Sequence, residues 1–428
     1  MNSVSISPGR LEGTVSVPPS KSAAHRAIIC AALSEGTSIL QPVAMSNDIA
    51  ATIACMRALG ASMTLEGSTL TVNGSGALHN KFVRPAVLDC GESGSTLRFL
   101  IPVAAALGAA AEFVGHGRLP MRPIGVFSDC LPPKGISFET EGGLPLKING
   151  RLQSGVFSVP GDVSSQFITG LLLALPLLEG DSEIILTTPL QSAGYIDMTI
   201  DIMRTFGVNV ERTNEGWLVS GGQSYKSRSF TVEGDWSQAA FFMTAAALGG
   251  HITIDNLDSS SYQGDKACVE IYSRFGARIA ESPDGSITIE GGELHGTDIN
   301  AENIPDMVPA LAVTAALCEG VTHITGAERL RIKECDRLAA MTDALTRLGA
   351  DIRETPDGLI IKGVKTLKGG SVEGCNDHRI VMSMSAASCR CDGDIIISDM
   401  ESVNKSYPSF FEDLKRLGGV CRIVPAET

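Results

Sequence analysis

One glycine position recurs six times along the sequence, and this repetition limits the possible folds more than any other feature. The gaps between successive copies are 75, 72, 69, 73 and 69 residues, and 428 residues divided by six gives about 71. A regular long spacing indicates one structural unit that is repeated and packed against its copies. The six glycines are Gly60, Gly135, Gly207, Gly276, Gly349 and Gly418.

Around this glycine, each copy reads as the end of a helix, a strand, a turn and a second strand. Upstream lies an Ala-rich segment with a polar start, predicted to be a buried helix because it is apolar on nearly all faces. A short strand and a second, amphipathic helix follow, so the predicted unit is βαβαββ. The matching stretches begin at Ala58, Thr205, Arg274 and Arg347, and the predicted buried helices are 21–34, 94–107, 163–177, 236–248, 306–318 and 376–389.

The two ends of the sequence complete this pattern. The sixth copy lacks its last strand, whereas residues 3–7 form an alternating strand ahead of the first copy, and we predict that the two pair. The chain would then cross between domains near Ser20 and return near residue 233. We therefore predict an α/β fold of two globular domains, each of three βαβαββ units with buried parallel helices, joined by a hinge of two crossings. The domains are residues 20–232, and residues 1–19 with 233–428.

Composition narrows the class of protein. The net charge is 34 − 48 = −14, which argues against nucleic acid or an anionic membrane as partner. No basic leader with an apolar core and no apolar run of about 18 residues occurs, so we expect a cytoplasmic protein. The eleven cysteines are scattered, as expected for reduced thiols, and we expect Cys389 and Cys391 not to form a metal site. We also expect a monomer.

The polar starts of the predicted buried helices suggest chemistry. Helix N-termini attract anions through free N–H groups and the helix dipole. Ser164, Asp235 and Asn376 are each interpreted as helix caps, since Ser, Asp and Asn are preferred there. Cations near a helix start oppose the dipole, so they indicate an anion held between charge and backbone. These cations are Lys21, Arg26 and Arg379, and Gly94 lets backbone N–H groups approach a ligand.

Further charged residues lie at loop edges in equivalent places of the repeats. Each cation alone is more often a solvated surface charge, but their recurrence favours a shared anion site. Asp306 and Glu334 stand among them as candidates for proton transfer. The cations are Arg122, Lys333, Arg337 and Lys405.

Eight short segments carry a resemblance that runs through the whole chain in order. The most specific are PSKSAAHRA from Pro19, SGST with Arg98, VSSQF from Val163, IKECDRL from Ile332 and NDHR from Asn376. Each is weak alone, but jointly they are specific. Together they resemble the 5-enolpyruvylshikimate-3-phosphate synthase family of enolpyruvyl transferases. The segments are residues 19–27, 91–99, 162–167, 192–197, 304–306, 331–337, 376–379 and 404–408.

This resemblance implies transfer of the enolpyruvyl group of phosphoenolpyruvate to the 5-hydroxyl of shikimate 3-phosphate, with release of phosphate. It implies no metal and no organic cofactor, and it places the reaction on the route to chorismate and the aromatic amino acids. By position, Asp306 matches the residue that accepts the 5-hydroxyl proton, while Glu334 and Lys21 match groups that protonate the methylene carbon. The implied shikimate 3-phosphate site is Lys21, Ser22, Arg26, Ser164, Ser165, Gln166, Ser192, Tyr195, Asp306 and Lys333.

The resemblance also implies a phosphoenolpyruvate site that the inhibitor glyphosate shares. The chain departs from the commonest family pattern at Glu92, Ser93, Ser95 and Arg329, which leaves glyphosate sensitivity open although Gly94 is retained. The implied phosphoenolpyruvate site is Lys21, Gly94, Arg122, Gln166, Arg337, Arg379 and Lys405.

Two alternatives remain. A sister transferase places enolpyruvyl on UDP-N-acetylglucosamine, but its loop carries a reactive cysteine, whereas the stretch from Gly115 has His116 and Arg118 and no cysteine. A noncatalytic or RNA-end-binding repeat protein would need an extended basic stripe, whereas the cations here are concentrated at helix starts.

Overall fold

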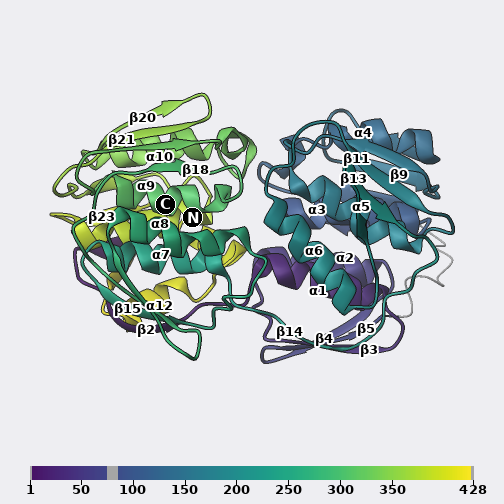
Figure 1. The fold of residues 1–428 in the computed structure, drawn as a ribbon, viewed down its shortest axis with the longest axis horizontal. Helices are drawn as coiled ribbons and strands as arrows, with labels where there is room; N and C mark the ends of the chain where they lie inside the picture. Colours follow the sequence, from purple (N-terminus) through teal and green to yellow (C-terminus); the bar gives the residue numbers. More distant parts are fainter. Residues whose placement is uncertain (1, 75–84, 426–428) are drawn as a thin grey trace. The chain divides into compact units, whose positions relative to one another are not determined.

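The computed structural model describes residues 2–74 and 85–425. The chain divides into two compact units (Figure 1). The N-terminal unit is Pro19–Val232, and the C-terminal unit is Met1–Pro18 together with Glu233–Thr428. No helix in the described part of the chain is both long and apolar enough to cross a membrane.

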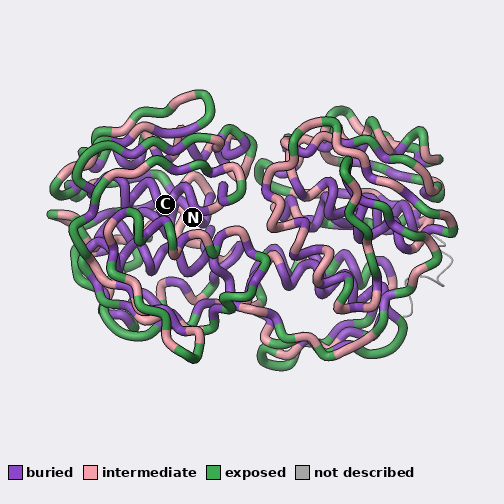
Figure 2. The backbone as a smooth tube through the Cα atoms, in the orientation of Figure 1, coloured by how far each residue is buried: buried purple, intermediate pink, exposed green. Residues whose placement is uncertain are grey.

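Each predicted buried segment contains an α-helix, and these six inner helices are buried along most of their length (Figure 2). Three of the segments end or begin with a 3₁₀ turn instead of continuing as α-helix, at Leu175–Leu177, Pro305–Met307 and Ser388–Arg390. The inner helices are α1 (Lys21–Leu33), α3 (Gly94–Ala106), α5 (Ser165–Ala174), α7 (Trp236–Ala247), α9 (Val308–Ala315) and α11 (His378–Ala387).

A second helix follows each inner helix, as the repeat predicts. These outer helices bury one face and expose the other; Ile196, Thr199 and Met203 face the core in the third copy. The outer helices are α2 (Asn47–Ala58), α4 (Gly125–Cys130), α6 (Ala193–Thr205), α8 (Cys268–Phe275), α10 (Arg337–Arg347) and α12 (Phe410–Arg416).

In the described residues, the N-terminal unit holds three four-stranded sheets of one pattern: the first strand runs parallel to the second, and the remaining neighbours are antiparallel. Their orders are β14-β3-β5-β4, β6-β7-β9-β8 and β10-β11-β13-β12. The strands are β3 (Thr37–Gln41), β4 (Ser62–Glu66), β5 (Thr69–Asn73), β6 (Ala86–Asp89), β7 (Ala111–Val114), β8 (Ile136–Glu139), β9 (Leu146–Gly150), β10 (Val156–Val159), β11 (Ser182–Leu186), β12 (Glu211–Arg212), β13 (Gly216–Val219) and β14 (Ser229–Thr231).

The C-terminal unit repeats this sheet pattern three times within the described residues. Its orders are β2-β15-β17-β16, β18-β19-β21-β20 and β22-β23-β1-β24. The strands are β1 (Ser3–Ser7), β2 (Glu12–Ser16), β15 (His251–Asp255), β16 (Arg278–Glu281), β17 (Ile287–Glu290), β18 (Asp298–Asn300), β19 (Val321–Thr325), β20 (Asp351–Thr355), β21 (Gly358–Lys362), β22 (Gly370–Val372), β23 (Ile395–Ile397) and β24 (Val420–Val424).

The predicted pairing of the two chain ends is confirmed. Strand β1 lies between β23 and β24 and is antiparallel to both, with Ile6 opposite Cys421. In its sheet, β1 has the third position, which in the other five sheets belongs to the second strand of the hairpin, such as β5. The N-terminal segment therefore completes the sixth repeat.

At each of the two crossings, the last strand before the crossing pairs within the unit that the chain is leaving. Strand β2 directly precedes α1 in the chain, yet it pairs with β15 of the C-terminal unit. Strand β14 directly precedes α7, yet it pairs with β3 of the N-terminal unit. Only residues 8–11 separate β1 from β2, so the anchoring of β1 keeps β2 in the same unit.

The six repeat glycines share one backbone conformation. Their φ angles lie between 85° and 110°, in the left-handed region where a Cβ is strained. Each therefore ends its helix and turns the chain into the following strand. This common geometry explains why the glycine, more than any other residue, marks the repeat in the sequence.

Candidate active site

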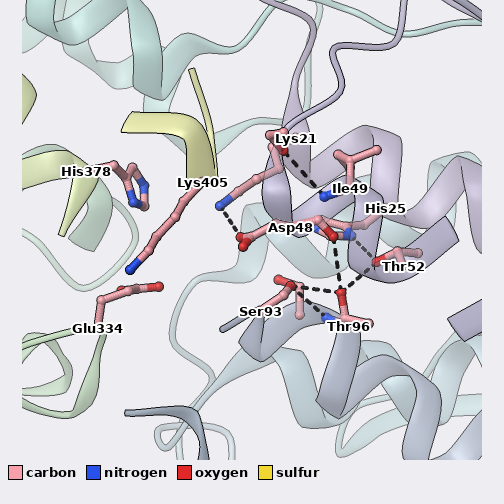
Figure 3. A network of polar contacts seen from close by, with 12 residues as sticks. Lys21, His25, Asp48, Ile49, Thr52, Ser93, Thr96, Glu334, His378 and Lys405 are labelled. Atoms are coloured by element: carbon pink, nitrogen blue, oxygen red, sulfur yellow. Dashed lines mark hydrogen bonds and ion pairs between the residues drawn. The ribbon is translucent and has the colours of Figure 1, made fainter. Parts of the chain in front are cut away.

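In the N-terminal unit, the start of α1 carries a partly buried ion pair. Ser20 caps the helix, and its Oγ accepts a hydrogen bond from the Ala23 N–H at 3.3 Å. Lys21 is the first helical residue, and its Nζ donates to Asp48 Oδ2 at 2.7 Å (Figure 3). Asp48 lies in the first turn of α2, where a carboxylate is favoured by the helix dipole. The pair fixes the Lys21 ammonium at the start of α1.

A chain of hydroxyl contacts joins α1, α2 and α3 beneath this pair (Figure 3). His25 Nδ1 lies 2.7 Å from Thr52 Oγ1, which lies 2.6 Å from Thr96 Oγ1. Ser93 caps α3 by accepting from the Thr96 N–H at 3.2 Å. Burial, followed by the charges of Lys21 and Arg26, lowers the pKa of His25 well below its usual value. At neutral pH this imidazole is therefore uncharged.

Arg26 lies one turn further along α1 and is only 2% exposed. Its Nε donates to Thr199 Oγ1 at 2.7 Å, its Nη1 to the Ser22 carbonyl at 2.7 Å and its Nη2 to the Tyr195 carbonyl at 3.2 Å. These partners are neutral, so burial lowers the pKa of Arg26 to about 10. The guanidinium stays charged at neutral pH and ties the start of α1 to α6.

The start of α3 lies against a second guanidinium. A Cβ added at Gly94 would come within 2.8 Å of Arg122 Cζ, so this close approach requires glycine. Further along α3, Arg98 Nη1 donates to Gln166 Oε1 at 2.7 Å, and its Nη2 donates to the Pro123 carbonyl at 2.9 Å. Gln166 in turn donates from Nε2 to Ser95 Oγ at 3.0 Å. Gln166 and Ser95 thus connect the starts of α5 and α3.

The remaining predicted residues of the N-terminal unit lie at the starts of α5 and α6. Ser164 caps α5, as predicted, with its Oγ accepting from the Gln166 N–H at 3.3 Å. Ser165 is the first residue of that helix. Ser192 immediately precedes α6 with φ 56°, and the ring of Tyr195 lies 6.0 Å from Arg26 Cζ.

In the C-terminal unit, Asp306 lies at the centre of a charged cluster at the start of α9. Its Oδ1 is 2.9 Å from Arg337 Nη1 and 3.6 Å from Lys333 Nζ, and its Oδ2 is 3.1 Å from Arg379 Nη2. Burial alone would raise its pKa, but Arg379, Lys333 and Arg337 outweigh burial and hold the pKa of Asp306 well below its usual value. The carboxylate is therefore ionised at neutral pH.

Arg337, also 2% exposed, joins this cluster to two more carboxylates. Its Nε donates to Asp377 Oδ2 at 2.7 Å, and its Nη2 donates to Glu334 Oε2 at 2.8 Å. Burial lowers its pKa, but Asp377, Glu334 and Asp306 more than offset burial and raise the pKa of Arg337 well above the usual value. Each of the three guanidinium nitrogens therefore donates to a carboxylate.

The predicted cap of α11 was wrong by one residue. Asp377, not Asn376, caps the helix, and its Oδ1 accepts from the Arg379 N–H at 2.9 Å. Asn376 has φ 49° and lies outside the helix; its carbonyl accepts from Lys405 Nζ at 2.6 Å, and its N–H donates to Asp399 Oδ2 at 2.8 Å. Asp235 does cap α7, as predicted.

Within the C-terminal unit, the fold brings five of the predicted residues into one cluster: Lys333, Glu334, Arg337 and Arg379 around Asp306. Lys405 joins through Asn376. Sequence reasoning missed three functional candidates, namely Asp48, Arg98 and Asp377. Each lies within or beside a polar helix start, and that position was the available signal. In the described residues, no group of three or more His, Cys, Asp or Glu side chains is placed to hold a metal ion.

Two of the departures from the commonest family pattern have structural roles. Ser93 supplies the cap of α3. Arg329 is buried, and its Nη2 donates to the Glu302 carbonyl. Both side chains therefore support the local backbone.

Comparison with known proteins places these features in a family. The family model of EPSP synthase (3-phosphoshikimate 1-carboxyvinyltransferase) matches residues 6–414. The chain belongs to the EPSP synthase family. The 3-phosphoshikimate 1-carboxyvinyltransferase of Clostridium perfringens is 49% identical over 99% of this chain and 100% of that protein, and that of Clostridium novyi is 46% identical over 98% of each. A solved EPSP synthase of Acinetobacter baumannii superposes with a TM-score of 0.83, at 30% identity, over 99% of this chain and all of that one.

Family membership gives the chain its enzyme class, a transferase, and the match to the solved relative extends over the residues of both units. The individual roles of the residues described above follow from the geometry and are proposed below.

Proposed function

We propose that the two sets of helix starts carry out the reaction of the EPSP synthase family in this chain. The enolpyruvyl group of phosphoenolpyruvate is transferred to the 5-hydroxyl of shikimate 3-phosphate, and inorganic phosphate is released. The single observation that carries the assignment of roles is the cluster around Asp306, where an ionised carboxylate and Glu334 lie among three cations. Such a cluster can bind anions and move protons at one place.

Shikimate 3-phosphate is assigned to groups at the starts of α1, α5 and α6, with Asp306 and Lys333. The charge of Arg26 is not offset by its neutral partners, which favours an anion nearby. Arg26 also holds the carbonyls of Ser22 and Tyr195, so it positions both segments. The proposed ligand groups are Lys21, Ser22, Arg26, Ser164, Ser165, Gln166, Ser192, Tyr195, Asp306 and Lys333.

Phosphoenolpyruvate carries a phosphate and a carboxylate, and both need cationic or N–H donors. Glyphosate, which carries a phosphonate and a carboxylate, presents the same two kinds of anion, so we propose it as an inhibitor. Gly94 contributes by allowing the close approach of Arg122. The proposed groups are Lys21, Gly94, Arg122, Gln166, Arg337, Arg379 and Lys405.

The proposed chemistry follows from the protonation states. Protonation of the methylene carbon of phosphoenolpyruvate builds positive charge at C2, the 5-hydroxyl oxygen then bonds to C2, and its proton is released. Asp306 is ionised and can accept that proton. Glu334 and Lys21 are proposed to exchange the proton at the methylene carbon. Loss of that proton and cleavage of the C2–O bond to phosphate complete the transfer.

Most of the acceleration is expected from holding two anionic substrates together. Orientation can supply about 7–11 kcal/mol of the barrier. A charge-assisted hydrogen bond supplies about 1.5–3 kcal/mol. Binding groups should therefore matter as much as the proton-transfer groups.

The test is phosphate release by the purified protein with phosphoenolpyruvate plus shikimate 3-phosphate, beside a parallel reaction with UDP-N-acetylglucosamine. Release with the shikimate compound alone supports the proposal. Release with the sugar nucleotide alone, or with neither, overturns it.

We also propose that the enzyme acts as a monomer in the cytoplasm. The net charge of −14 and the eleven free cysteines support this, because they suit a reducing compartment and disfavour self-association. Light scattering after size exclusion should give the mass of one chain, and a dimer mass would contradict the proposal.

A further inference from the structure

Two neighbouring loops of the C-terminal unit are joined beside Lys405. One loop follows β22, and the other follows β23, which runs parallel to β22 in the same sheet. The Gly374 N–H donates to Ser398 Oγ at 3.0 Å, and the Asn376 N–H donates to Asp399 Oδ2 at 2.8 Å. Both bonds hold backbone N–H groups of the first loop, and the second is the stronger kind because its acceptor is a carboxylate.

Asp399 is connected to Lys405 along two routes. Along the chain, Asp399 directly precedes the 3₁₀ helix Met400–Lys405, of which Lys405 is the last residue. Through space, Asp399 accepts from the Asn376 N–H, and the Asn376 carbonyl accepts from Lys405 Nζ at 2.6 Å. The two routes close a ring, which limits where the ammonium group can lie. Lys405 is 5% exposed, and its side chain points toward Glu334 (Figure 3).

The backbone of this ring has a conformation that residues with a side chain seldom adopt. In the described part of the chain, five residues other than glycine have a left-handed φ, and three of them lie here: Cys375 (54°), Asn376 (49°) and Asp399 (57°). Asn and Asp tolerate this conformation better than Cys does. It persists only where surrounding contacts fix it, and it is concentrated at functional sites. The Asp399 carboxylate is a contact that fixes the Asn376 peptide.

We propose that Asp399 is a positioning residue for the phosphoenolpyruvate site. Its carboxylate holds the Asn376 peptide, whose carbonyl directs the Lys405 ammonium toward the phosphoenolpyruvate anion. Without the carboxylate, the Asn376 N–H loses this acceptor, the peptide can turn, and Lys405 loses its fixed direction. The inference rests on the proposed function, because Lys405 is assigned to phosphoenolpyruvate there.

Three substitutions separate the carboxylate from the backbone conformation of Asp399. Asp399→Gly removes the acceptor and suits left-handed backbone. Asp399→Asn also suits this backbone, and it keeps an oxygen that can accept from the Asn376 N–H. Asp399→Ser is a second version without the carboxylate, and Ser192 shows that a serine adopts this conformation in the same chain. Thermal unfolding identifies which variants are folded.

The matched control is Asp392→Gly. Asp392 Oδ1 accepts from the Gly369 N–H at 3.0 Å, so it also joins two loops through a carboxylate and a backbone N–H. These loops enter β22 and β23, at the opposite ends of the two strands from Asp399. The control therefore removes the same kind of bond from the same pair of strands without touching the ring that holds Lys405.

Phosphate release kinetics give the first readout. In Asp399→Gly and Asp399→Ser, the KM for phosphoenolpyruvate should rise about tenfold, the size of one weakened hydrogen bond to a charged group. The kcat and the KM for shikimate 3-phosphate should change little, because Lys405 is assigned to the other substrate. Asp399→Asn should restore the parent KM, and Asp392→Gly should keep it. A merely structural loss would reduce the amount of active enzyme, and thus kcat, without this selective change.

The second readout needs no substrate. Acetic anhydride acetylates amines, and peptide mass mapping reports how fast Lys405 is labelled. Labelling should be about tenfold faster in Asp399→Gly than in the parent, Asp399→Asn and Asp392→Gly, because the bond to the Asn376 carbonyl no longer holds the amine. A parent that releases no phosphate would overturn the proposed function, while the labelling would still test the ring. Unchanged labelling of Lys405, the parent KM for phosphoenolpyruvate in the folded Gly and Ser variants, or an equal rise in both KM values would each overturn the positioning role.

Discussion

The two units are built from the same repeat, yet they accommodate a buried arginine at a helix start in opposite ways. Arg26 and Arg337 are both 2% exposed. The partners of Arg26 are hydroxyl and carbonyl oxygens, whereas Arg337 contacts the carboxylates of Asp306, Glu334 and Asp377. The pKa of Arg26 is lowered to about 10, and that of Arg337 is raised.

This difference indicates a division of work. In the N-terminal unit, neutral hydroxyl and carbonyl groups stabilise the charge of Arg26. No carboxylate among these partners neutralises that charge, so it can still attract an anionic ligand. In the C-terminal cluster three cations (Lys333, Arg337, Arg379) face three carboxylates, so the cluster is close to neutral and Asp306 stays ionised. One unit is suited to attract an anion, and the other to hold its groups in place and move protons.

The largest effect is expected from removing the charge at the centre of the C-terminal cluster. Asp306→Asn keeps the shape of the side chain but cannot accept the 5-hydroxyl proton, so kcat should fall by about 10²–10⁴-fold. Phosphate release at saturating substrates measures it. The control Asp343→Asn removes an exposed carboxylate from α10 and should leave kcat unchanged. A wild-type rate for Asp306→Asn would remove Asp306 from the mechanism.

Stability should distinguish the two arginines next. Arg337→Met leaves three carboxylates without their shared cation, and breaking a buried pair in this way costs about 3–5 kcal/mol. Urea unfolding followed by circular dichroism measures the loss. Arg347→Met, at the exposed end of the same helix, should cost much less, because an exposed ion pair contributes little to stability. Equal losses for the two variants would contradict the network described for Arg337.

A smaller loss is expected from the matching change in the N-terminal unit. Arg26→Met leaves neutral oxygens behind, and an unsatisfied neutral acceptor costs about 1–3 kcal/mol. Arg204→Met, exposed on α6, is the control. The same unfolding assay applies, and binding of shikimate 3-phosphate by calorimetry should weaken. If Arg26→Met lost as much stability as Arg337→Met, the proposed contrast between the two units would be wrong.

The approach of Arg122 to Gly94 can be tested with a single methyl group. In Gly94→Ala the added Cβ meets the guanidinium at 2.8 Å, so Arg122 must move away. We expect glyphosate to bind about tenfold more weakly, which corresponds to about 1.4 kcal/mol. Gly125→Ala is a matched control because its Cβ would meet no atom within 4 Å. Inhibition curves that coincide for the two variants would remove Arg122 from the inhibitor site.

Local patterns predicted most of the fold. The repeat glycine, the apolar helices and the pairing of β1 all follow from periodicity and turn chemistry, which neighbouring residues determine. The sheet partners of β2 and β14 do not follow from the residues of these strands alone, because a short strand can have the same pattern in either sheet. For β2, the partner is determined by the anchoring of β1, from which only residues 8–11 separate it, and this is a tertiary effect.

The site was predicted through cations that fit no capping role, and its unseen members are mainly carboxylates. Asp48 and Asp377 stand at helix starts, where an acidic residue is equally explained as a cap. Only the folded contacts show that Asp377 both caps α11 and accepts from Arg337. Asn and Asp are equally preferred as helix caps, so the sequence does not distinguish Asn376 from Asp377. The left-handed backbone of Asn376 places it outside the helix, and the sequence does not show that conformation.

The two units should also differ in their response to acid, which changes no side chain. His25 has a folded pKa below 6.5, so below pH 6.5 the unfolded state binds more protons and the N-terminal unit loses stability, by at most about 1.4 kcal/mol per pH unit. Asp306 has a folded pKa below 3.8, so its contribution to the C-terminal unit stays intact at pH 5 and is lost only below about pH 4.

Two variants divide this acid response. His25→Asn keeps an oxygen near Thr52 but does not titrate, so it should flatten the stability profile between pH 6.5 and 5, whereas Asp306→Asn should flatten it only below about pH 4. Urea unfolding at pH 7.5, 5.5 and 3.5 measures both. If Asp306→Asn changed the slope of the unfolding free energy against pH near pH 6, the Asp306 carboxylate would not be held ionised by its cations. The contrast between Arg26, which neutral oxygens surround, and Arg337, which carboxylates surround, would then be wrong.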